Sequence, residues 1–563
     1  MRLTTFKPGY SLALIVVGLA VFLQCYEFGY ITYDDPLYIT ENPIVRRGIS
    51  WNSIVESFSY VGESNLWHPI TYISHSLDVS LFGLENPSGA HCLNVFLHVA
   101  AAVLLYQLFL KIGVTNKWAF LVALLWLVHP LRVQSVAWLS ERKDLLSGCF
   151  FLLSLAYWLN YLVKKKNSQI YYLLSLLLYI CACMSKPSVL GLPFLLIVFW
   201  IHAPRRKELN SYKKLLIAVI PFVLVSLSIG YATLHMHSQG GLTADSNFYQ
   251  RLQVMPVSFI YYIRETFLPV DNRFWVYLPA SSKLPYISLL CFVSIAILGG
   301  LVLKFCSHSR LMMVGLCWYI LLWFPVSGLV QFGPYFVADR YSYLSQVGLF
   351  MMLIGFFQDV YTCGNKKYLA VLTALIVTTC AGLTMYELKF WHSSEELFER
   401  EVKINSRSLL APIHLGIEKM KKGENDEALR LFELAITIDA RSGLAYSNAG
   451  VAAEALNKLD TAEIYYKKAI DGLLHNPTPY FRLANLKEKN GMFVSAGALY
   501  KEATTRFPHS SKAFCFLGYY ELRTKKDTRD ALKYFNNSLK LDSENSLARK
   551  GLDIISANQK KIR

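Results

Sequence analysis

The sequence predicts an all-α protein built from two unlike parts: a polytopic bundle of membrane-spanning helices, followed by an α-solenoid of short helical repeats. Three observations predict this. Long apolar runs are confined to residues 8–390, basic residues gather in short clusters between those runs, and a period of 34 residues appears after residue 411. The chain of 563 residues is long enough to hold both parts.

The composition is apolar and basic, and the placement of the charges indicates a membrane. Hydrophobic residues make up 54% of the chain and the formal net charge is +17. A basic protein can bind nucleic acid, but here Lys and Arg lie between apolar runs, as in retained cytoplasmic loops. The clusters are Lys164–Lys166, Arg205–Lys207, Lys213–Lys214 and Lys366–Lys367. We therefore expect contact with membrane lipids and no nucleic-acid partner.

The first apolar run, from Tyr10 to about Tyr30, is long enough to cross a bilayer. It lacks a small-residue cleavage site and further runs follow it, so we interpret it as an anchor rather than a cleaved signal. Arg2 and Lys7 precede it, which places the N-terminus in the cytoplasm. Residues 31–90 then form a large polar loop on the outer side.

Ten further apolar segments bring the expected number of spans to eleven. They are residues 92–111, 117–137, 145–163, 170–187, 189–203, 213–234, 284–304, 312–330, 345–361 and 368–388. An odd number places everything after residue 390 on the extracytoplasmic side, which is the periplasm for the bacterial inner membrane that we expect. The segment 250–268 stays open between an interfacial helix and another span; one full span there would reverse the orientation.

Residues 1–390 thus form the membrane domain, residues 391–411 a linker, and residues 412–563 about four copies of one repeat. The matching positions are Gly416, Ala428, Phe432 and Ala435; Gly450, Ala462, Tyr466 and Ala469; Ala484, Ala496, Tyr500 and Ala503; and Gly518, Ala531 and Phe535. Small residues let paired helices approach closely and the aromatic ring fills the groove, which is the tetratricopeptide pattern. Such a solenoid binds a peptide or partner protein and seldom catalyses a reaction, so any chemistry belongs to the membrane domain.

Polar residues gather where the membrane domain faces outward. Paired carboxylates directly after a span can supply a general base, so Asp34 and Asp35 are the catalytic candidates. Cations at the membrane boundary can hold a departing lipid phosphate. The donor-phosphate candidates are Arg142, Lys143, Lys186 and Arg340. The other pocket candidates are Tyr38, His68, His129, Glu141, Asp144, Asp339 and Tyr341.

Each of these groups also has a structural interpretation. Asp34 and Asp35 precede a proline and can cap a turn. The cluster Glu141–Asp144 and the pair Asp339–Arg340 can be salt-bridged loops. Lys186 can extend its ammonium group to the membrane interface.

A metal site is not expected. His68, His75 and His129 are spaced too widely to form a recognisable ligand set, and packing or hydrogen bonding is their expected role. The cysteines lack CxxC pairs, and Cys181 and Cys183 lie in an apolar run. We expect no cofactor, and a lipid-linked sugar as substrate.

Several motifs of the membrane domain are specific as a set. They are Asp34-Asp35-x-x-Tyr38, Asn42-Pro43, Trp67-His68-Pro69-Ile70-Thr71, Phe82-Gly83, Asn94 with His98, His129-Pro130 through Ser147, Ser185-Lys186-Pro187, and Asp339-Arg340-Tyr341-Ser342-Tyr343-Leu344. Together they resemble the transmembrane and tetratricopeptide-repeat O-mannosyltransferases and their bacterial relatives. The resemblance runs from about residue 30 to 345 and continues in the repeats.

This resemblance implies a GT-C glycosyltransferase fold, inverting transfer from a polyprenyl-phosphate sugar, and an acidic pair in the first outer loop that acts at the acceptor. By that carry-over Asp34 or Asp35 is the base, whereas the donor-phosphate roles are assigned from charge and position. One position departs from the pattern, because Gln134 stands where relatives commonly have Glu. Mannose is therefore not assumed.

The leading interpretation is an enzyme that transfers a sugar from a polyprenyl-phosphate donor to a protein Ser or Thr hydroxyl, or to a glycan, held by the repeats at the outer face. The alternative is a non-enzymatic membrane scaffold or assembly factor that recruits a partner through its repeats. A scaffold needs no acidic pair beside a basic site. A transporter is disfavoured because the ionisable residues gather at the outer ends of spans rather than at the midplane.

Overall fold

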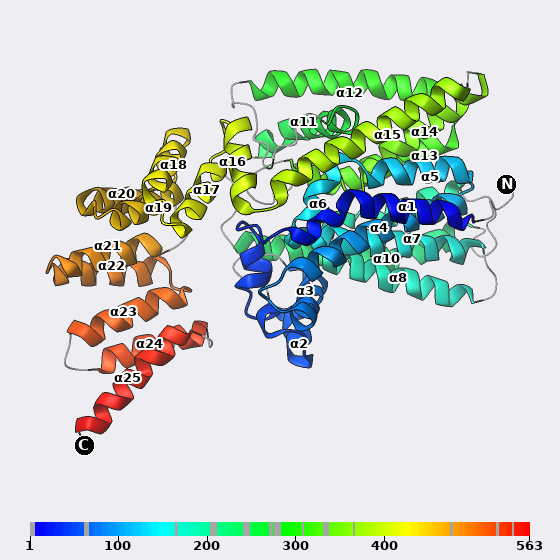
Figure 1. Ribbon diagram of the computed structural model, residues 1–563. Helices are drawn as coiled ribbons and strands as arrows, with labels where there is room; N and C mark the ends of the chain where they lie inside the picture. The colour runs from blue at the N-terminus through cyan, green and yellow to red at the C-terminus, as the bar shows by residue number, and fades with distance from the viewer. Residues whose placement is uncertain are drawn as a thin grey trace. The chain divides into compact units, whose positions relative to one another are not determined.

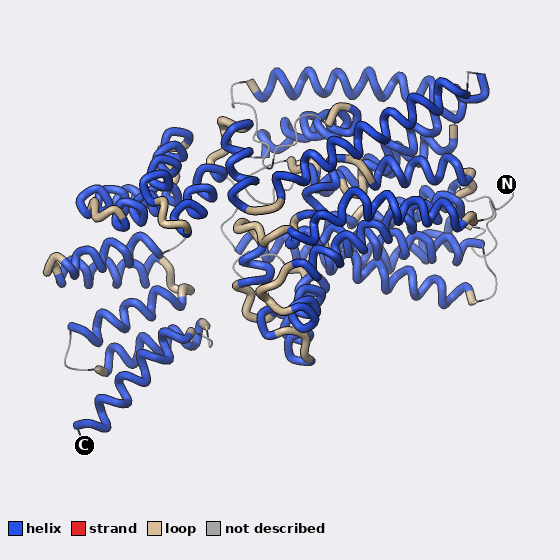
Figure 2. The backbone as a smooth tube through the Cα atoms, in the orientation of Figure 1, coloured by secondary structure: helices blue, strands red, loops and turns tan. Residues whose placement is uncertain are grey.

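The computed structural model describes residues 6–562 apart from 61–66, 164–166, 203–210, 240–247, 270–273, 275–282, 307–308, 330–336, 364–365, 473–476, 525–527 and 543–544. The described residues form helices and connecting loops without a β-strand, as the sequence predicts (Figure 2). The chain divides into two compact units, Met1–Ile404 and Asn405–Arg563. The basic clusters Lys164–Lys166 and Arg205–Lys207 lie outside the described residues.

The first unit is a bundle whose long helices run side by side (Figure 1). Its α-helices are α1 (Pro8–Phe22), α2 (Trp51–Ser59), α3 (Pro69–Phe82), α4 (Ser88–Lys111), α5 (Asn116–Leu127), α6 (Val133–Ala137), α7 (Arg142–Val163), α8 (Ser168–Ser185), α9 (Leu192–His202), α10 (Tyr212–Gln239), α11 (Phe248–Phe267), α12 (Leu284–Cys306), α13 (Arg310–Trp323), α14 (Gln346–Cys363), α15 (Lys366–Leu388) and α16 (Ser394–Ile404). Within it α4 packs against α1, α5 and α7, and α7 packs against α8.

Among the described residues, seven helices are long and apolar enough to cross a membrane, or eight if the bent pair α5 and α6 is one span. The seven are Pro8–Glu27, Ser88–Lys111, Leu139–Val163, Ser168–Ser185, Tyr212–Met236, Leu284–Val302 and Ala370–Trp391. Three shorter apolar helices, Pro187–His202, Arg310–Val326 and Gln346–Gln358, coincide with the remaining expected spans. This is the make-up of a multi-pass membrane protein. The helix α11 occupies the open segment 250–268 and is not among these candidates.

The bend between α5 and α6 measures 62° and falls at His129-Pro130. Proline has no backbone N–H to continue the helix and disfavours helical geometry in the residue before it. His129 is accordingly extended, and its ring accepts a hydrogen bond from the Leu131 N–H at 3.3 Å. The bend turns residues 133–144 away from the direction of α5, and this segment carries much of the site.

The second unit is a stack of helix pairs, as the repeat period predicts. Its helices are α17 (Leu410–Lys421), α18 (Asn425–Ile438), α19 (Gly443–Ala455), α20 (Leu459–Asp471), α21 (Thr478–Lys489), α22 (Phe493–Arg506), α23 (Ser511–Thr524), α24 (Arg529–Leu541) and α25 (Ser546–Ile562). Each helix packs against the next one along the chain. A Cβ atom at Gly450 would lie 2.5 Å from the Tyr466 ring. The glycine therefore lets the two helices pack closely around this ring, as the sequence pattern implies.

Candidate active site

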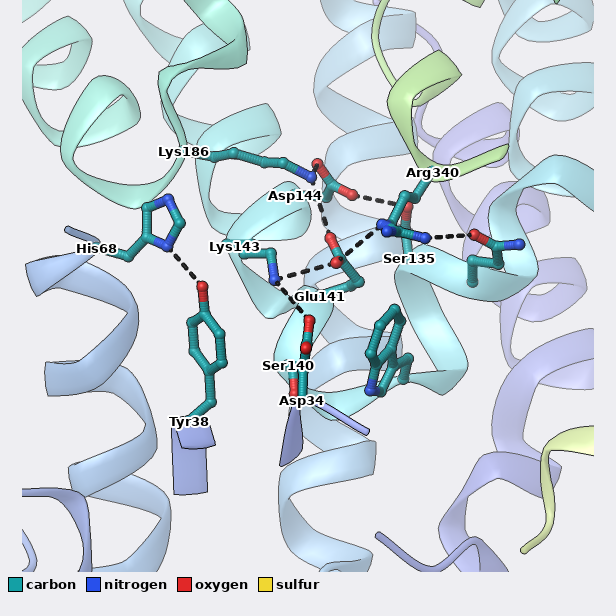
Figure 3. A network of polar contacts seen from close by, with 12 residues as sticks. Asp34, Tyr38, His68, Ser135, Ser140, Glu141, Lys143, Asp144, Lys186 and Arg340 are labelled. Carbon is teal, nitrogen blue, oxygen red and sulfur yellow. Dashed lines mark hydrogen bonds and ion pairs between the residues drawn. The ribbon is translucent and has the colours of Figure 1, made fainter. Parts of the chain in front are cut away.

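Segments far apart in the sequence bring most of the candidate residues together (Figure 3). They are the turn before the π-helical η2 (Pro36–Thr40), which carries Asp34 and Asp35; the short helix η5 (Leu139–Glu141) with the first turn of α7; Lys186, which follows α8; and the short helix η8 (Asp339–Ser342), which carries Arg340. Each segment is a helix end, a short helix or a turn, and most of the side chains that they contribute are buried.

The centre of the cluster is the buried carboxylate of Glu141, which contacts three cations. Its Oε1 atom lies 3.0 Å from Lys143 Nζ and 3.1 Å from Arg340 Nε, and its Oε2 atom lies 3.0 Å from Lys186 Nζ. Burying charges costs free energy unless they are paired. This cluster of paired, buried charges is therefore the candidate active site.

A pocket opens beside two of these cations. It is lined by Asp144, Ser147, Lys186, Ser188, Leu322, Arg340, Tyr341, Tyr343, Leu344 and Ser345. Lys186 Nζ also lies 2.7 Å from Asp144 Oδ1, and Ser135 donates to Asp144 Oδ2 at 3.1 Å. The Tyr341 ring lies beneath both Lys186 and Arg340, with centroid distances of 5.5 and 5.2 Å. The wall of this pocket can therefore bind an anionic group.

Asp34 lies at the accessible edge of the cluster. Its Oδ2 atom is 3.9 Å from Lys143 Nζ, and its side chain is 23% exposed, in contrast to the buried Glu141. Partial burial raises the pKa of Asp34 above its usual value, and Lys143 opposes this rise. A carboxylate with a raised pKa that can be reached from outside is suited to accept a proton.

Asp35 is fully buried and serves as a structural brace. Its Oδ2 atom accepts from the Ile31 N–H at 2.7 Å, and its Oδ1 atom accepts from the Ser140 N–H at 2.9 Å and from the Ser140 hydroxyl. Burial nevertheless raises the pKa of Asp35 to about 6, against the opposing effect of these hydrogen bonds. Asp35 thereby fixes the turn that carries Asp34 to η5, which carries Glu141.

Tyr38 and His68 form a pair on the other side of Lys143. The Tyr38 hydroxyl lies 2.8 Å from His68 Nδ1, and Lys143 Nζ lies 4.3 Å from the centroid of the Tyr38 ring. Burial lowers the pKa of His68 well below its usual value, and the positive charges of Lys143 and Lys186 add to this. His68 is therefore a neutral hydrogen-bonding partner that orients Tyr38.

Arg142 does not enter the cluster, although it is adjacent to Lys143. Its guanidinium is fully buried and contacts Asp78, donates to Asn94 Oδ1 at 2.8 Å and donates to the Ala90 carbonyl at 2.7 Å. These partners lie on α3 and α4. Arg142 thus holds helices together, and the structure places it away from the other donor-phosphate candidates.

His129 and Asp339 are hydrogen-bonded to residues of α11. His129 Nε2 lies 3.1 Å from the Thr266 carbonyl. Asp339 accepts a hydrogen bond from the Tyr261 hydroxyl at 2.8 Å, and burial holds the pKa of Asp339 well above its usual value. Both residues tie the site-bearing segments to α11.

Sequence reasoning missed two residues of the site and left the role of a third open. Trp138 lies beneath the Arg340 guanidinium, at 5.2 Å from ring centroid to Cζ, and Ser140 bonds Asp35. Gln134 accepts a hydrogen bond from Arg340 Nη1 at 3.2 Å. The signal for Trp138 and Ser140 was their position just before Glu141, inside the segment between two apolar runs that already held candidate residues.

Comparisons with known proteins agree with this architecture. A tetratricopeptide-repeat family model matches residues 444–471. Protein O-mannosyl-transferase TMTC1 of Homo sapiens is 23% identical over 77% of this chain and 55% of its own length. Protein O-mannosyl-transferase TMTC3 of Homo sapiens is 23% identical over 85% of this chain and 58% of its own length. The chain thus spans little more than half the length of these relatives.

Among solved structures, the crystal structure of MamA aligns with 27% of this chain and 89% of its own, with a TM-score of 0.24 and 19% identity. The matches to the protein O-mannosyl-transferases confirm the family resemblance that the sequence motifs predict.

Proposed function

We propose that this chain, a homologue of the protein O-mannosyl-transferases, is an integral-membrane glycosyltransferase. It transfers a sugar from a polyprenyl-phosphate carrier to a Ser or Thr hydroxyl of a protein that the repeats bind. The reaction takes place at the extracytoplasmic face. The names of the relatives support the reaction class. The observation that carries the proposal is the buried Glu141 with three cations around it, beside a polar pocket and next to the accessible Asp34.

The proposed roles follow from the position of each group. Asp34 is the general base, because it is the exposed carboxylate of the acidic pair. Lys186 and Arg340 hold the donor phosphate, because both line the pocket. Lys143 lies 3.9 Å from Asp34 and 3.0 Å from Glu141. It therefore links the general base electrostatically to the carboxylate that contacts the phosphate-binding cations.

In the transfer step the acceptor hydroxyl gives its proton to the carboxylate of Asp34. The hydroxyl oxygen forms a bond to the anomeric carbon while the bond from that carbon to the phosphate oxygen breaks. The electron pair of the broken bond leaves with the lipid phosphate, whose charge becomes more negative. Lys186 and Arg340 stabilise that added charge in a region of low dielectric, and attack opposite the leaving group inverts the anomeric centre.

The Asp34→Asn substitution tests this assignment. An amide cannot accept the proton, so kcat for sugar transfer from a polyprenyl-phosphate donor to a Ser/Thr peptide is expected to fall about 100- to 10,000-fold. The variant should fold, because Asp34 is partly exposed and Asp35 makes the bracing bonds. Ser59→Ala is the control, since Ser59 lies in the same loop and its hydroxyl donates to the nearby Glu56 carbonyl. Full activity in Asp34→Asn would remove Asp34 from the mechanism.

The sugar and the acceptor are tested in cells. Mass spectrometry of extracytoplasmic proteins with and without this gene should find peptides that lose a single hexose or pentose increment in its absence. An unchanged glycoproteome, together with inactive purified protein, would favour the scaffold alternative.

A further inference from the structure

The polar segment that follows the last apolar helix of the first unit contacts the loop that carries Asp34. We call residues 391–401 the strap; it runs from Trp391 through the first two turns of α16 to Glu401. Nothing in the transfer step described above uses these residues. They lie more than 350 positions away from the loop along the sequence.

The strap is hydrogen-bonded to residues 29–32, directly before the acidic pair. The hydroxyl of Ser394 accepts from the Thr32 N–H at 2.9 Å and donates to the Tyr30 carbonyl at 3.2 Å. The Gly29 N–H donates to the His392 carbonyl at 3.0 Å. Three bonds therefore fix this stretch of backbone, and Ser394 is itself buried.

The strap also reaches the ion cluster through a row of buried rings. Trp391 lies 5.5 Å from Phe274 and 6.2 Å from Trp138, measured between ring centroids. Trp138 in turn lies beneath the guanidinium of Arg340. The Glu401 carboxylate accepts from the Phe274 N–H at 2.9 Å, which holds that ring in place. The strap thus contacts both the base-carrying loop and the aromatic support of a phosphate-binding cation.

We propose that Ser394 is a positioning residue of the transferase. Its hydrogen bonds hold the loop that carries Asp34 in a fixed position relative to the cations that contact Glu141. The expected effect on catalysis rests on the proposed function. The positioning of the loop rests on the hydrogen bonds alone. Ser394 acts through the backbone of Thr32, two residues before Asp34, and touches no reacting atom. A shift of the base by about 1 Å is enough to slow a reaction by up to about 100-fold.

The test compares full-length wild type with Ser394→Ala and Ser394→Thr. Hydrogen–deuterium exchange should be about fivefold faster in the peptide covering residues 28–35 of Ser394→Ala, because the Thr32 amide loses its acceptor. The kcat for transfer should fall about 10- to 100-fold while KM for the lipid-linked donor stays unchanged. Ser394→Thr keeps the hydroxyl and should restore both values towards wild type.

Thr384→Val is the matched control. Thr384 is buried and donates to the Val128 carbonyl at 2.7 Å, so the variant also loses a long-range bond, between residues 256 positions apart, without touching residues 29–35. It should leave kcat and the exchange of residues 28–35 unchanged. Unchanged exchange of these residues in Ser394→Ala would overturn the positioning role while leaving the proposed function intact. If the wild type transfers no sugar, the proposed function fails and the exchange experiment alone decides the role of Ser394.

Discussion

Asp34 and Asp35 are adjacent carboxylates in different surroundings, and the difference assigns them different roles. Asp34 is partly exposed and faces Lys143, whereas both oxygens of Asp35 accept hydrogen bonds from Ile31 and Ser140. Consecutive side chains in a turn point in different directions, so here only Asp34 faces Lys143. A sequence that shows two equal acids cannot say which one does.

Asp35→Asn is expected to lower the stability of the protein. The amide nitrogen of asparagine cannot accept a hydrogen bond, so the donors on one side of residue 35, either Ile31 or Ser140, lose their acceptor. A buried donor left without a partner costs about 1–3 kcal/mol. The thermal unfolding midpoint in detergent, compared with that of Asp34→Asn, measures this. Asp34→Asn should change the midpoint much less, because the Asp34 side chain keeps some contact with solvent.

The difference in stability between wild type and Asp35→Asn should depend on pH, and the burial of Asp35 sets the sign of this dependence. In the folded protein the pKa of Asp35 is raised to about 6 from 3.8. Between about pH 4 and about pH 6 the folded state therefore binds more protons than the unfolded chain, so stability from this group is full at low pH and is lost as pH rises through 6. The midpoint difference between wild type and Asp35→Asn should be widest at about pH 4 and narrow above about pH 6; a difference that widens with pH would contradict the raised pKa.

The convergence of Lys143, Lys186 and Arg340 could be predicted from the sequence, because each lies at an end of an apolar run that the charge pattern assigns to the same side of the membrane. The separation of Arg142 from Lys143 could not. Consecutive residues on a helix point about 100° apart, so one faces the cluster and the other faces α3 and α4. Choosing between them requires the positions of Asp78 and Asn94, which lie on other helices.

At the scale of elements, Arg142 joins α7 to α3 and α4. Asp78→Ala leaves its guanidinium buried without a counter-charge, and breaking such a pair costs about 3–5 kcal/mol. The expected result is a large fall in the thermal unfolding midpoint. Glu56→Ala is the control, because Glu56 pairs with Arg47 where both side chains are about half exposed, and exposed pairs contribute about 0–1 kcal/mol. Equal effects of the two substitutions would contradict the bracing role of Arg142.

Most helices of the first unit could be predicted, since each expected apolar run coincides with a helix. The helix α16 could not be predicted from an apolar run. It is short and polar, with Glu395 and Glu396 in its first turn, and the sequence there reads as a linker between apolar and repeat segments. Its contacts with residues 29–32 join positions more than 350 residues apart, and no local pattern encodes such a contact.

At the scale of the whole molecule, the two units should contribute separately to activity. Gly450→Leu places a side chain against the Tyr466 ring, where even a Cβ atom would lie at 2.5 Å, and overpacking typically costs about 1–3 kcal/mol. We expect KM for a protein acceptor to rise while turnover with a short peptide is unchanged. Gly299→Leu is the control, because no heavy atom lies within 4 Å of a Cβ at that position in α12. A loss of peptide turnover in Gly450→Leu would show that the repeats do more than bind the acceptor.

Under the proposed function, the ion pairs of Glu141 have a consequence for the release of the lipid-phosphate product. The Glu141 carboxylate already offsets much of the charge of Lys143, Lys186 and Arg340, and Asp144 adds to this beside Lys186. The lipid phosphate left after transfer therefore meets cations whose attraction is partly cancelled, which favours its dissociation over inhibition. For the same reason, we expect dissolved phosphate to compete only weakly with the proposed lipid-linked donor.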